Sequence, residues 1–142
     1  MKKVGVLGTG AVGVTLANGL KDLGYEVTIG SREPKKIENW NSPVTTFAEA
    51  SKNAELVVLA VKGHAAESLV KSIKTELLGK TVIDTTNPIA SEPPENGVLK
   101  FFTTLEDSLM ERLQKAVPKA SFVKAFNAVG SGLMVHPQFQ SK

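Results

Sequence analysis

The chain has 142 residues, of which 42% are hydrophobic and 22% charged, so it has the size and composition of one globular domain and not of a disordered or fibrous chain. It contains no cysteine, which excludes disulfides, thiolate catalysis and metal sites with cysteine ligands. A net charge of +3 accompanies only one Trp, one Tyr and six Phe, with no basic stripe interleaved with aromatic residues, so nucleic-acid binding is not expected.

The N-terminal stretch MKKVGVLGTGAVGVTLA begins with two lysines and continues with apolar residues, as a signal peptide does. Glycines at positions 5, 8, 10 and 13 interrupt it, and no apolar run reaches the roughly 18 residues of a membrane-spanning helix. We therefore expect a strand followed by a helix here, no membrane association, and a location in the cytoplasm.

The first thirty residues have the pattern strand, helix, strand. A short apolar run at 4–7 leads into a cluster of glycines, and the run at 26–29 also has the length of a strand. Between them apolar residues recur at helical spacing, and Gly24 follows as the expected end of the helix. The apolar residues of this helix are Val12, Leu16, Leu20 and Leu23.

The middle of the chain alternates in the same way. Residues 33–43 are polar and predict a short helix or an irregular loop, with a short strand at 44–45. Thr46 and Glu49 match the capping box, so a helix is predicted to run from there to Lys52. The run LVVLAV at 56–61 is apolar on both faces, which predicts a central parallel strand covered by helices on each side.

Two further helices and two strands are predicted in the second half. The first helix ends near Gly79, a strand follows at 81–84, and a loop with several prolines spans 85–104. The second helix stops before Pro118 and is followed by a strand at 121–125. The predicted apolar faces are Leu69, Ile73 and Leu77 in the first helix, and Leu105, Leu109, Leu113 and Ala116 in the second.

Strands that alternate with helices pair in parallel through right-handed crossovers. The sequence therefore predicts the α/β class, as a Rossmann doubly wound parallel sheet with strand order 3-2-1-4-5-6 in three layers, α/β/α. We expect a single domain over residues 1–142, because no repeat and no low-complexity linker divides the chain.

The motif Gly8-Thr9-Gly10-Ala11-Val12-Gly13 reads G-x-G-x-x-G, and it stands after a predicted strand and at the start of a predicted helix. In that context the first glycine allows a tight turn, the second lets the backbone approach a pyrophosphate, and the third lets helix and strand pack closely. The N–H groups at the helix N-terminus attract the pyrophosphate charge. The motif therefore predicts a dinucleotide-binding site.

The stretch GSREPKK ends the second strand, where an acidic residue would accept hydrogen bonds from the ribose 2′-hydroxyl of NAD. Gly30 supplies no acceptor, whereas Ser31 can donate a hydrogen bond and Arg32 can bind a phosphate through two N–H groups. Lys35 or Lys36 adds further positive charge. The sequence therefore predicts NADP(H) as the cofactor.

The chain carries, in this order, the stretches VGVLGTGAVGVTLANGL, YEVTIGSREP, ELVVLAVK, VIDTTNPI and FVKAFNAVG, followed by HPQF. With them it resembles the cofactor-binding domain of the NADPH-dependent F420 reductases, also called F420H2:NADP oxidoreductases. That group is distantly similar to the reductase domains of the STEAP metalloreductases. The resemblance implies an oxidoreductase that transfers hydride between NADPH and F420, a flavin or another acceptor.

The resemblance also implies a set of cofactor-binding residues, ordered from the pyrophosphate through the 2′-phosphate to the nicotinamide. Those at the pyrophosphate would be Thr9 and the backbone of Gly10, Ala11 and Val12. Those at the 2′-phosphate would be Ser31, Arg32 and Lys36. The path to the nicotinamide would be lined by Val61 and Lys62, the nicotinamide would lie near Thr86, Asn87 and Pro88, and the second redox partner would stack at Asn127 and Ala128.

Members of this family usually continue past HPQF with further strands and a C-terminal helical segment, which helps to form the acceptor pocket and often a dimer. The present chain reaches Lys142 without such a segment. We therefore expect it to correspond to the family's N-terminal NADP-binding domain with an incomplete acceptor pocket. The formation of a homodimer is an alternative that the sequence leaves open.

No side chain stands out as catalytic, which hydride transfer permits because the cofactors carry the reaction. His64 precedes a predicted helix and is expected to be a cap or a surface residue, and His136 has no carboxylate near it in the sequence. Asp84 ends a strand on the cofactor side, where it could instead brace the following loop through backbone bonds. Two separated histidines without cysteine predict no metal site.

Two alternatives to a reductase of this family stay open. The first is a non-catalytic module that binds NADPH as a sensor or scaffold. The second is the nucleotide domain of a hydroxyacid dehydrogenase or an imine reductase-like enzyme, which would need a helical substrate domain after it. For a reductase of this family, which is the favoured hypothesis, the expected partner is a small-molecule electron acceptor, with neither nucleic acid nor a membrane involved.

Overall fold

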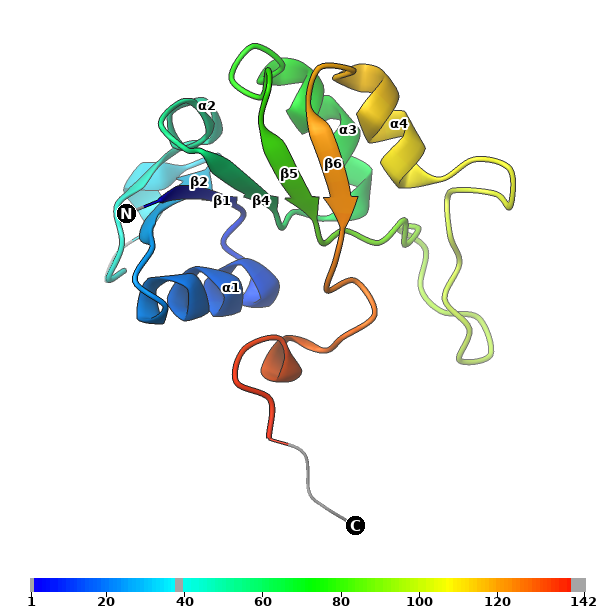
Figure 1. Cartoon of the computed structure of the whole chain (residues 1–142). Coiled ribbons are helices and arrows are strands. Elements are labelled where there is room, and N and C mark those ends of the chain that lie inside the picture. The colour runs from blue at the N-terminus through cyan, green and yellow to red at the C-terminus, as the bar shows by residue number, and fades with distance from the viewer. Residues whose placement is uncertain (1, 38–39, 139–142) are drawn as a thin grey trace.

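The computed structural model describes residues 2–37 and 40–138, and within these ranges the chain is built around one parallel sheet (Figure 1). Its strand order is β3-β2-β1-β4-β5-β6, which confirms the predicted order. The order reverses between β1 and β4, and such a switch point is where open α/β sheets bind ligands. The strands are β1 Lys3–Leu7, β2 Glu26–Ser31, β3 Val44–Thr46, β4 Leu56–Leu59, β5 Thr81–Asp84 and β6 Ser121–Lys124.

Helices cover both faces of the sheet, which confirms the predicted three layers (Figure 1). The helix α1 Ala11–Asp22 lies on one face, and the other face carries α2 Phe47–Lys52, α3 Gly63–Ser72 and α4 Leu109–Ala116. Two 3-10 turns are also described, η1 Pro34–Lys36 and η2 Ser131–Leu133, and η2 packs against α1.

The first strand shows how one apolar run serves both layers. Val4 and Val6 are buried on the side of α1, where they belong to the same apolar cluster as Leu16. Leu7 is buried in the cluster that lies beneath α2, α3 and α4. Alternate residues of a strand point to opposite faces, so a strand covered on both sides must be apolar throughout.

Several predicted boundaries shift in the structure. The second strand continues to Ser31, two residues beyond its predicted end. The helix α3 ends at Ser72, and Ile73 and Leu77 are buried in the turns that follow it. The apolar spacing therefore predicted burial correctly but overestimated helix length. The predicted loop at 33–43 contains the short helix η1, and its residues 38–39 lie outside the described part of the chain, as does Phe139 of HPQF.

The predicted cap at Thr46 is confirmed, since its Oγ1 accepts a hydrogen bond from the Glu49 N–H at 3.2 Å.

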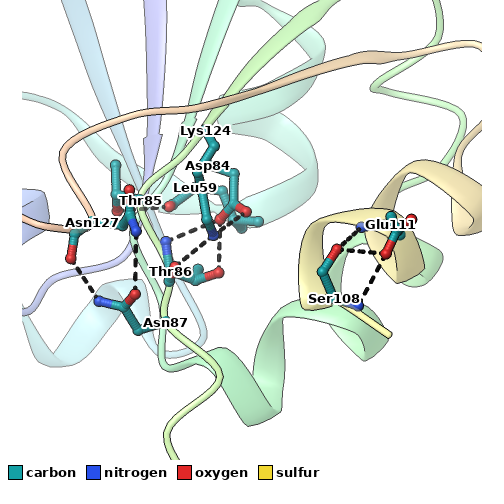
Figure 2. Close-up of polar contacts among 9 residues, drawn as sticks. All are labelled: Leu59, Asp84, Thr85, Thr86, Asn87, Ser108, Glu111, Lys124 and Asn127. Atoms are coloured by element: carbon teal, nitrogen blue, oxygen red, sulfur yellow. Dashed lines mark hydrogen bonds and ion pairs between the residues drawn. The ribbon is translucent and has the colours of Figure 1, made fainter. Parts of the chain in front are cut away.

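The start of α4 requires a correction. The sequence placed Leu105 on this helix, but Leu105 is fully exposed and the helix begins at Leu109. Ser108 caps it: Ser108 Oγ accepts from the Glu111 N–H at 3.2 Å, and Glu111 Oε2 accepts from the Ser108 N–H at 3.0 Å (Figure 2). This reciprocal capping box fixes the helix N-terminus after Leu105.

Replacing the cap serine should destabilise the protein. Ser108→Ala removes an N-cap acceptor and should lower the free energy of unfolding by about 1 kcal/mol, measured by urea denaturation at neutral pH. Ser91→Ala, at an exposed serine outside the helices, is the control and should change it by less than ~0.5 kcal/mol. Equal effects of the two substitutions would contradict the capping role.

The same cap predicts a dependence on pH. Hydrogen bonds from the Ser108 backbone and side chain lower the pKa of Glu111, so the ionised carboxylate is favoured in the folded state. A lowered carboxyl pKa stabilises the fold above the unfolded-state pKa, and this contribution is lost as the pH falls through the folded-state pKa. The difference in stability between wild type and the Ser108→Ala variant should therefore narrow in acid.

Candidate functional site

A groove of about 750 Å³ lies at the switch point of the sheet, along the carboxyl ends of β1, β2 and β4. We call it the first groove. Its walls are the glycine turn at 8–10, the basic loop that follows β2, the segment 60–62 after β4, and one side of α3. Segments far apart in the sequence thus meet where the fold predicts a ligand.

The three glycines of the turn serve different purposes. A Cβ at Gly8, whose φ is +131°, would collide with the Ala60 carbonyl, and a Cβ at Gly13 would collide with the Gly8 carbonyl. The fold therefore requires both glycines. Gly10 has an ordinary φ of −78°, and a Cβ there would have no described protein atom within 4 Å. Its bare backbone faces open groove, which is what the approach of a pyrophosphate requires.

Gly10 is the N-cap residue of α1, the helix has no side-chain cap from any described residue, and its first turn holds no acidic residue. The N–H groups of that turn have no partner inside the helix. The helix dipole adds a partial positive charge at the same place, so an anion in the groove would be stabilised there.

The basic loop forms the other end of the first groove. Ser31 is 7% exposed, and its Oγ accepts a hydrogen bond from the Glu33 N–H at 3.1 Å, so the loop folds back over the strand end. Arg32 is exposed and lines the groove. Lys36 also lines it and forms an ion pair with Glu33, at 2.5 Å between Nζ and Oε1. This end of the groove is positively charged, and the Glu33 carboxylate already neutralises part of that charge.

Gly30 also has a packing role, in addition to the one predicted from the sequence. A Cβ at this position would lie 2.9 Å from Leu7 Cδ2 and 3.0 Å from Phe47 Cδ1, so packing against the core favours glycine here. Because β2 runs on to Ser31, the side chains that face a bound ribose are expected to be those of Ser31 and Arg32. Packing therefore also favours glycine at position 30, and the link between the missing acid and NADP(H) stays a prediction.

A second groove of about 530 Å³ continues from the first toward the carboxyl end of β5. Both grooves are lined by Gly10, Ala60, Val61, Lys62 and His64, so they share a wall. The far end of the second groove is lined by the segments 85–87 and 89–91. Together the two grooves form one path from the basic loop, past the glycine turn, to the segment after β5.

Hydrogen bonds hold the segment after β5 in place (Figure 2). The Asp84 carboxylate accepts from the Thr86 N–H at 2.9 Å and from the Thr86 hydroxyl at 2.7 Å. Asn87 Nδ2 donates to the Asn127 carbonyl at 2.8 Å, and Thr85 Oγ1 donates to the Leu59 carbonyl at 2.9 Å. The reading of Asp84 as a brace for the next loop is therefore confirmed.

The structure brings most of the predicted site residues together. Those that line one or both grooves are Gly8, Thr9, Gly10, Val12, Ser31, Arg32, Lys36, Val61, Lys62, Thr86 and Asn87. Four others line neither groove: Ala11 opens α1, Gly13 packs beneath the turn, Pro88 accepts a hydrogen bond from the Phe102 N–H, and Ala128 is exposed beyond β6. Their roles in binding stay predictions.

One side of α3 lines the first groove, although the sequence had not predicted this side as part of the site. His64, Ser68 and Ser72 line the first groove at a spacing of four residues, next to Ala65 and Leu69. His64 is exposed, as expected, but it is not the cap: α3 has Lys62 as its N-cap residue, and His64 lies within the first turn. The signal in the sequence was this polar stripe, which is hard to distinguish from an ordinary solvated helix face.

The described part of the chain holds neither a helix that is long and apolar enough to cross a membrane nor a group of three or more His, Asp or Glu side chains placed to hold a metal ion. The fold and the two grooves define a class of protein, a Rossmann-type domain with a glycine turn and a switch-point groove suited to a dinucleotide.

Comparison with known proteins gives the family. Residues 3–88 match the family model described as NADP oxidoreductase, coenzyme F420-dependent, and the chain belongs to this family. The resemblance identified from the sequence motifs is thereby confirmed.

Two curated relatives extend the comparison. Metalloreductase STEAP3 of Rattus norvegicus is 32% identical over 132 residues, which cover 91% of this chain and 25% of STEAP3. The F420-dependent NADP reductase of Methanothermobacter marburgensis is 37% identical over 103 residues, which cover 63% of this chain and 46% of that protein. The chain thus spans between a quarter and just under half of these relatives.

Solved structures confirm the fold class. A crystal structure described as a candidate F420-dependent NADP reductase from Arthrobacter sp. FB24 aligns with a TM-score of 0.87 and 34% identity, over 96% of this chain and 67% of that one. Pyrroline carboxylate reductase of Plasmodium falciparum, with NADP bound, aligns with a TM-score of 0.64 and 19% identity, over 87% of this chain and 41% of that one. The second likeness shows the fold alone.

The different roles of the glycines can be separated by experiment. Gly10→Ala places a methyl group in open groove, so it should leave the free energy of unfolding unchanged but weaken NADPH binding by about tenfold or more. Gly13→Ala forces a Cβ against the Gly8 carbonyl and should lower the free energy of unfolding by roughly 1–3 kcal/mol. Urea denaturation and titration calorimetry measure the two effects. A Gly10→Ala variant that binds NADPH normally would contradict the role of the turn.

Proposed function

We propose that the chain binds NADP(H) along the two grooves, with the 2′-phosphate at Ser31, Arg32 and Lys36 and the nicotinamide beside Thr86 and Asn87. We further propose that it is the nucleotide-binding part of an oxidoreductase that transfers hydride between NADPH and F420, a flavin or a similar acceptor. The observation that carries the proposal is that the open face of Gly10 and the basic loop border one groove.

Three independent observations support this assignment. The groove lies at the switch point, where sheets of this topology bind ligands. It has cationic side chains at one end and uncharged hydroxyl and amide groups at the other, which matches a cofactor with a phosphate at one end only. The family to which the chain belongs is described as one of NADP oxidoreductases.

The part of this chain in such a reaction is placement. When bound, NADPH supplies a hydride from C4 of its nicotinamide, which reduces the acceptor and leaves NADP+. The first turn of α1 holds the pyrophosphate through backbone N–H groups, and Arg32 holds the 2′-phosphate by charge. Fixing these two points orients the ring at the far end, and orientation alone accelerates a transfer that needs no side-chain acid or base.

Loss of Arg32 tests the cofactor assignment. A charge-assisted hydrogen bond contributes roughly 1.5–3 kcal/mol, so Arg32→Ala should weaken NADPH binding about ten- to a hundredfold and leave NADH binding nearly unchanged. Lys35→Ala is the matched control, because Lys35 is a neighbouring cation that does not line the groove. Titration calorimetry gives both affinities. Equal affinity of the wild type for NADPH and NADH would overturn the phosphate assignment.

A second experiment tests the acceptor. Bound NADPH should be oxidised in stopped-flow mixing with F420 or FMN, and the rate should rise with the acceptor concentration. NADPH that binds but is oxidised by neither acceptor, even when the chain is tested within a protein as long as its F420-dependent relative, would favour the non-catalytic sensor. Oxidation by an imine or an oxoacid alone would favour the imine reductase or hydroxyacid dehydrogenase alternative.

A further inference from the structure

The ion pair between Asp84 and Lys124 lies next to Thr86 (Figure 2), a residue that lines the second groove. Asp84 ends β5 and is 0% exposed, and Lys124 ends β6 beside it. Lys124 Nζ lies 2.7 Å from Asp84 Oδ2. Neither side chain lines the second groove.

The two charges share one neighbour, Thr86. Asp84 Oδ1 accepts from the Thr86 N–H and from the Thr86 hydroxyl, and Lys124 Nζ also donates to the Thr86 carbonyl at 2.6 Å. The N–H, the carbonyl and the hydroxyl of one residue are therefore all held by this ion pair. A carboxylate buried so completely needs such partners, and in return it fixes them in place.

The next residue, Asn87, is held from two other directions. Its Nδ2 donates to the Asn127 carbonyl, on the chain segment that leaves β6. Its carbonyl lies against the first residue of α3, where a Cβ on Gly63 would collide with it. The segment Thr86–Asn87 is thus clamped between the ends of β5 and β6 and the N-terminus of α3, and both residues line the second groove.

We propose that Asp84 and Lys124 are positioning residues, which hold Thr86, and through the backbone the adjoining Asn87, in the arrangement that receives the nicotinamide end of NADP(H). The proposal rests on the function proposed above and adds residues that do not touch the cofactor. They act through the shape of the wall. If the pair served folding alone, its loss would lower the stability of the protein but would not weaken binding at the nicotinamide end more than at the adenosine end.

Two ligands distinguish the contributions that the two ends of the cofactor make to binding. NADPH fills both grooves, whereas adenosine 2′,5′-bisphosphate carries the adenosine and its phosphates but no nicotinamide. Lys124→Met should weaken NADPH binding by about tenfold or more and leave the affinity for adenosine 2′,5′-bisphosphate within about twofold of wild type. Lys119→Met is the matched control: Lys119 is an exposed lysine just before the amino end of β6, opposite the carboxyl end where Lys124 lies, and its loss should change neither affinity.

A second variant removes the effect of a buried unpaired charge. Lys124→Met leaves the Asp84 carboxylate without its cation and should lower the free energy of unfolding, whereas the double variant Asp84→Asn/Lys124→Met should regain much of that stability. NADPH binding that stays weak in the stable double variant supports a positioning role. NADPH binding that returns with stability, or an equal loss for both ligands, would overturn it. Wild-type protein that binds neither ligand would instead overturn the proposed function itself.

Discussion

The close backbone contact between the glycine turn and the residues just after β4 is the constraint on which the rest of the site depends. Gly8 lies against the Ala60 carbonyl and Gly13 lies against Gly8, with no space for a Cβ at either position. This contact fixes where α1 begins and therefore where its first N–H groups point. It also keeps side chains out of the switch point between β1 and β4, so that a groove remains where a less tightly packed turn would place side-chain atoms.

The two ends of the path recognise a ligand by different means. Near Ser31 the cationic groups are exposed to the groove, so attraction there is electrostatic. Near Thr86 the charged groups are paired with each other and do not line the groove, which is lined by hydroxyl, amide and small apolar side chains. Geometry matters more than charge at that end. The contributions of the two ends to binding can therefore be altered separately, because they depend on residues from different strands.

Much of the fold could be predicted because its signals are local: the glycine motif and the apolar runs alone place β1, α1 and β4. The start of α4 was misplaced because the apolar spacing from Leu105 was given more weight than Ser108 and Glu111, which form the actual cap. The site was predictable where a motif is contiguous. Asp84 and Lys124 lie 40 residues apart and are brought together by the pairing of β5 with β6, so no spacing in the sequence reveals that they form an ion pair.

The ion pair between Glu33 and Lys36 also affects how cofactor binding responds to ionic strength. A phosphate that engages Lys36 replaces a carboxylate that is already there, so one ion pair is exchanged for another. Dissolved salt screens both pairs, with a Debye length of about 8 Å at physiological ionic strength. The affinity for a phosphorylated cofactor should therefore fall less steeply with salt than the cations of the loop suggest, since Glu33 acts as a counter-ion built into the chain.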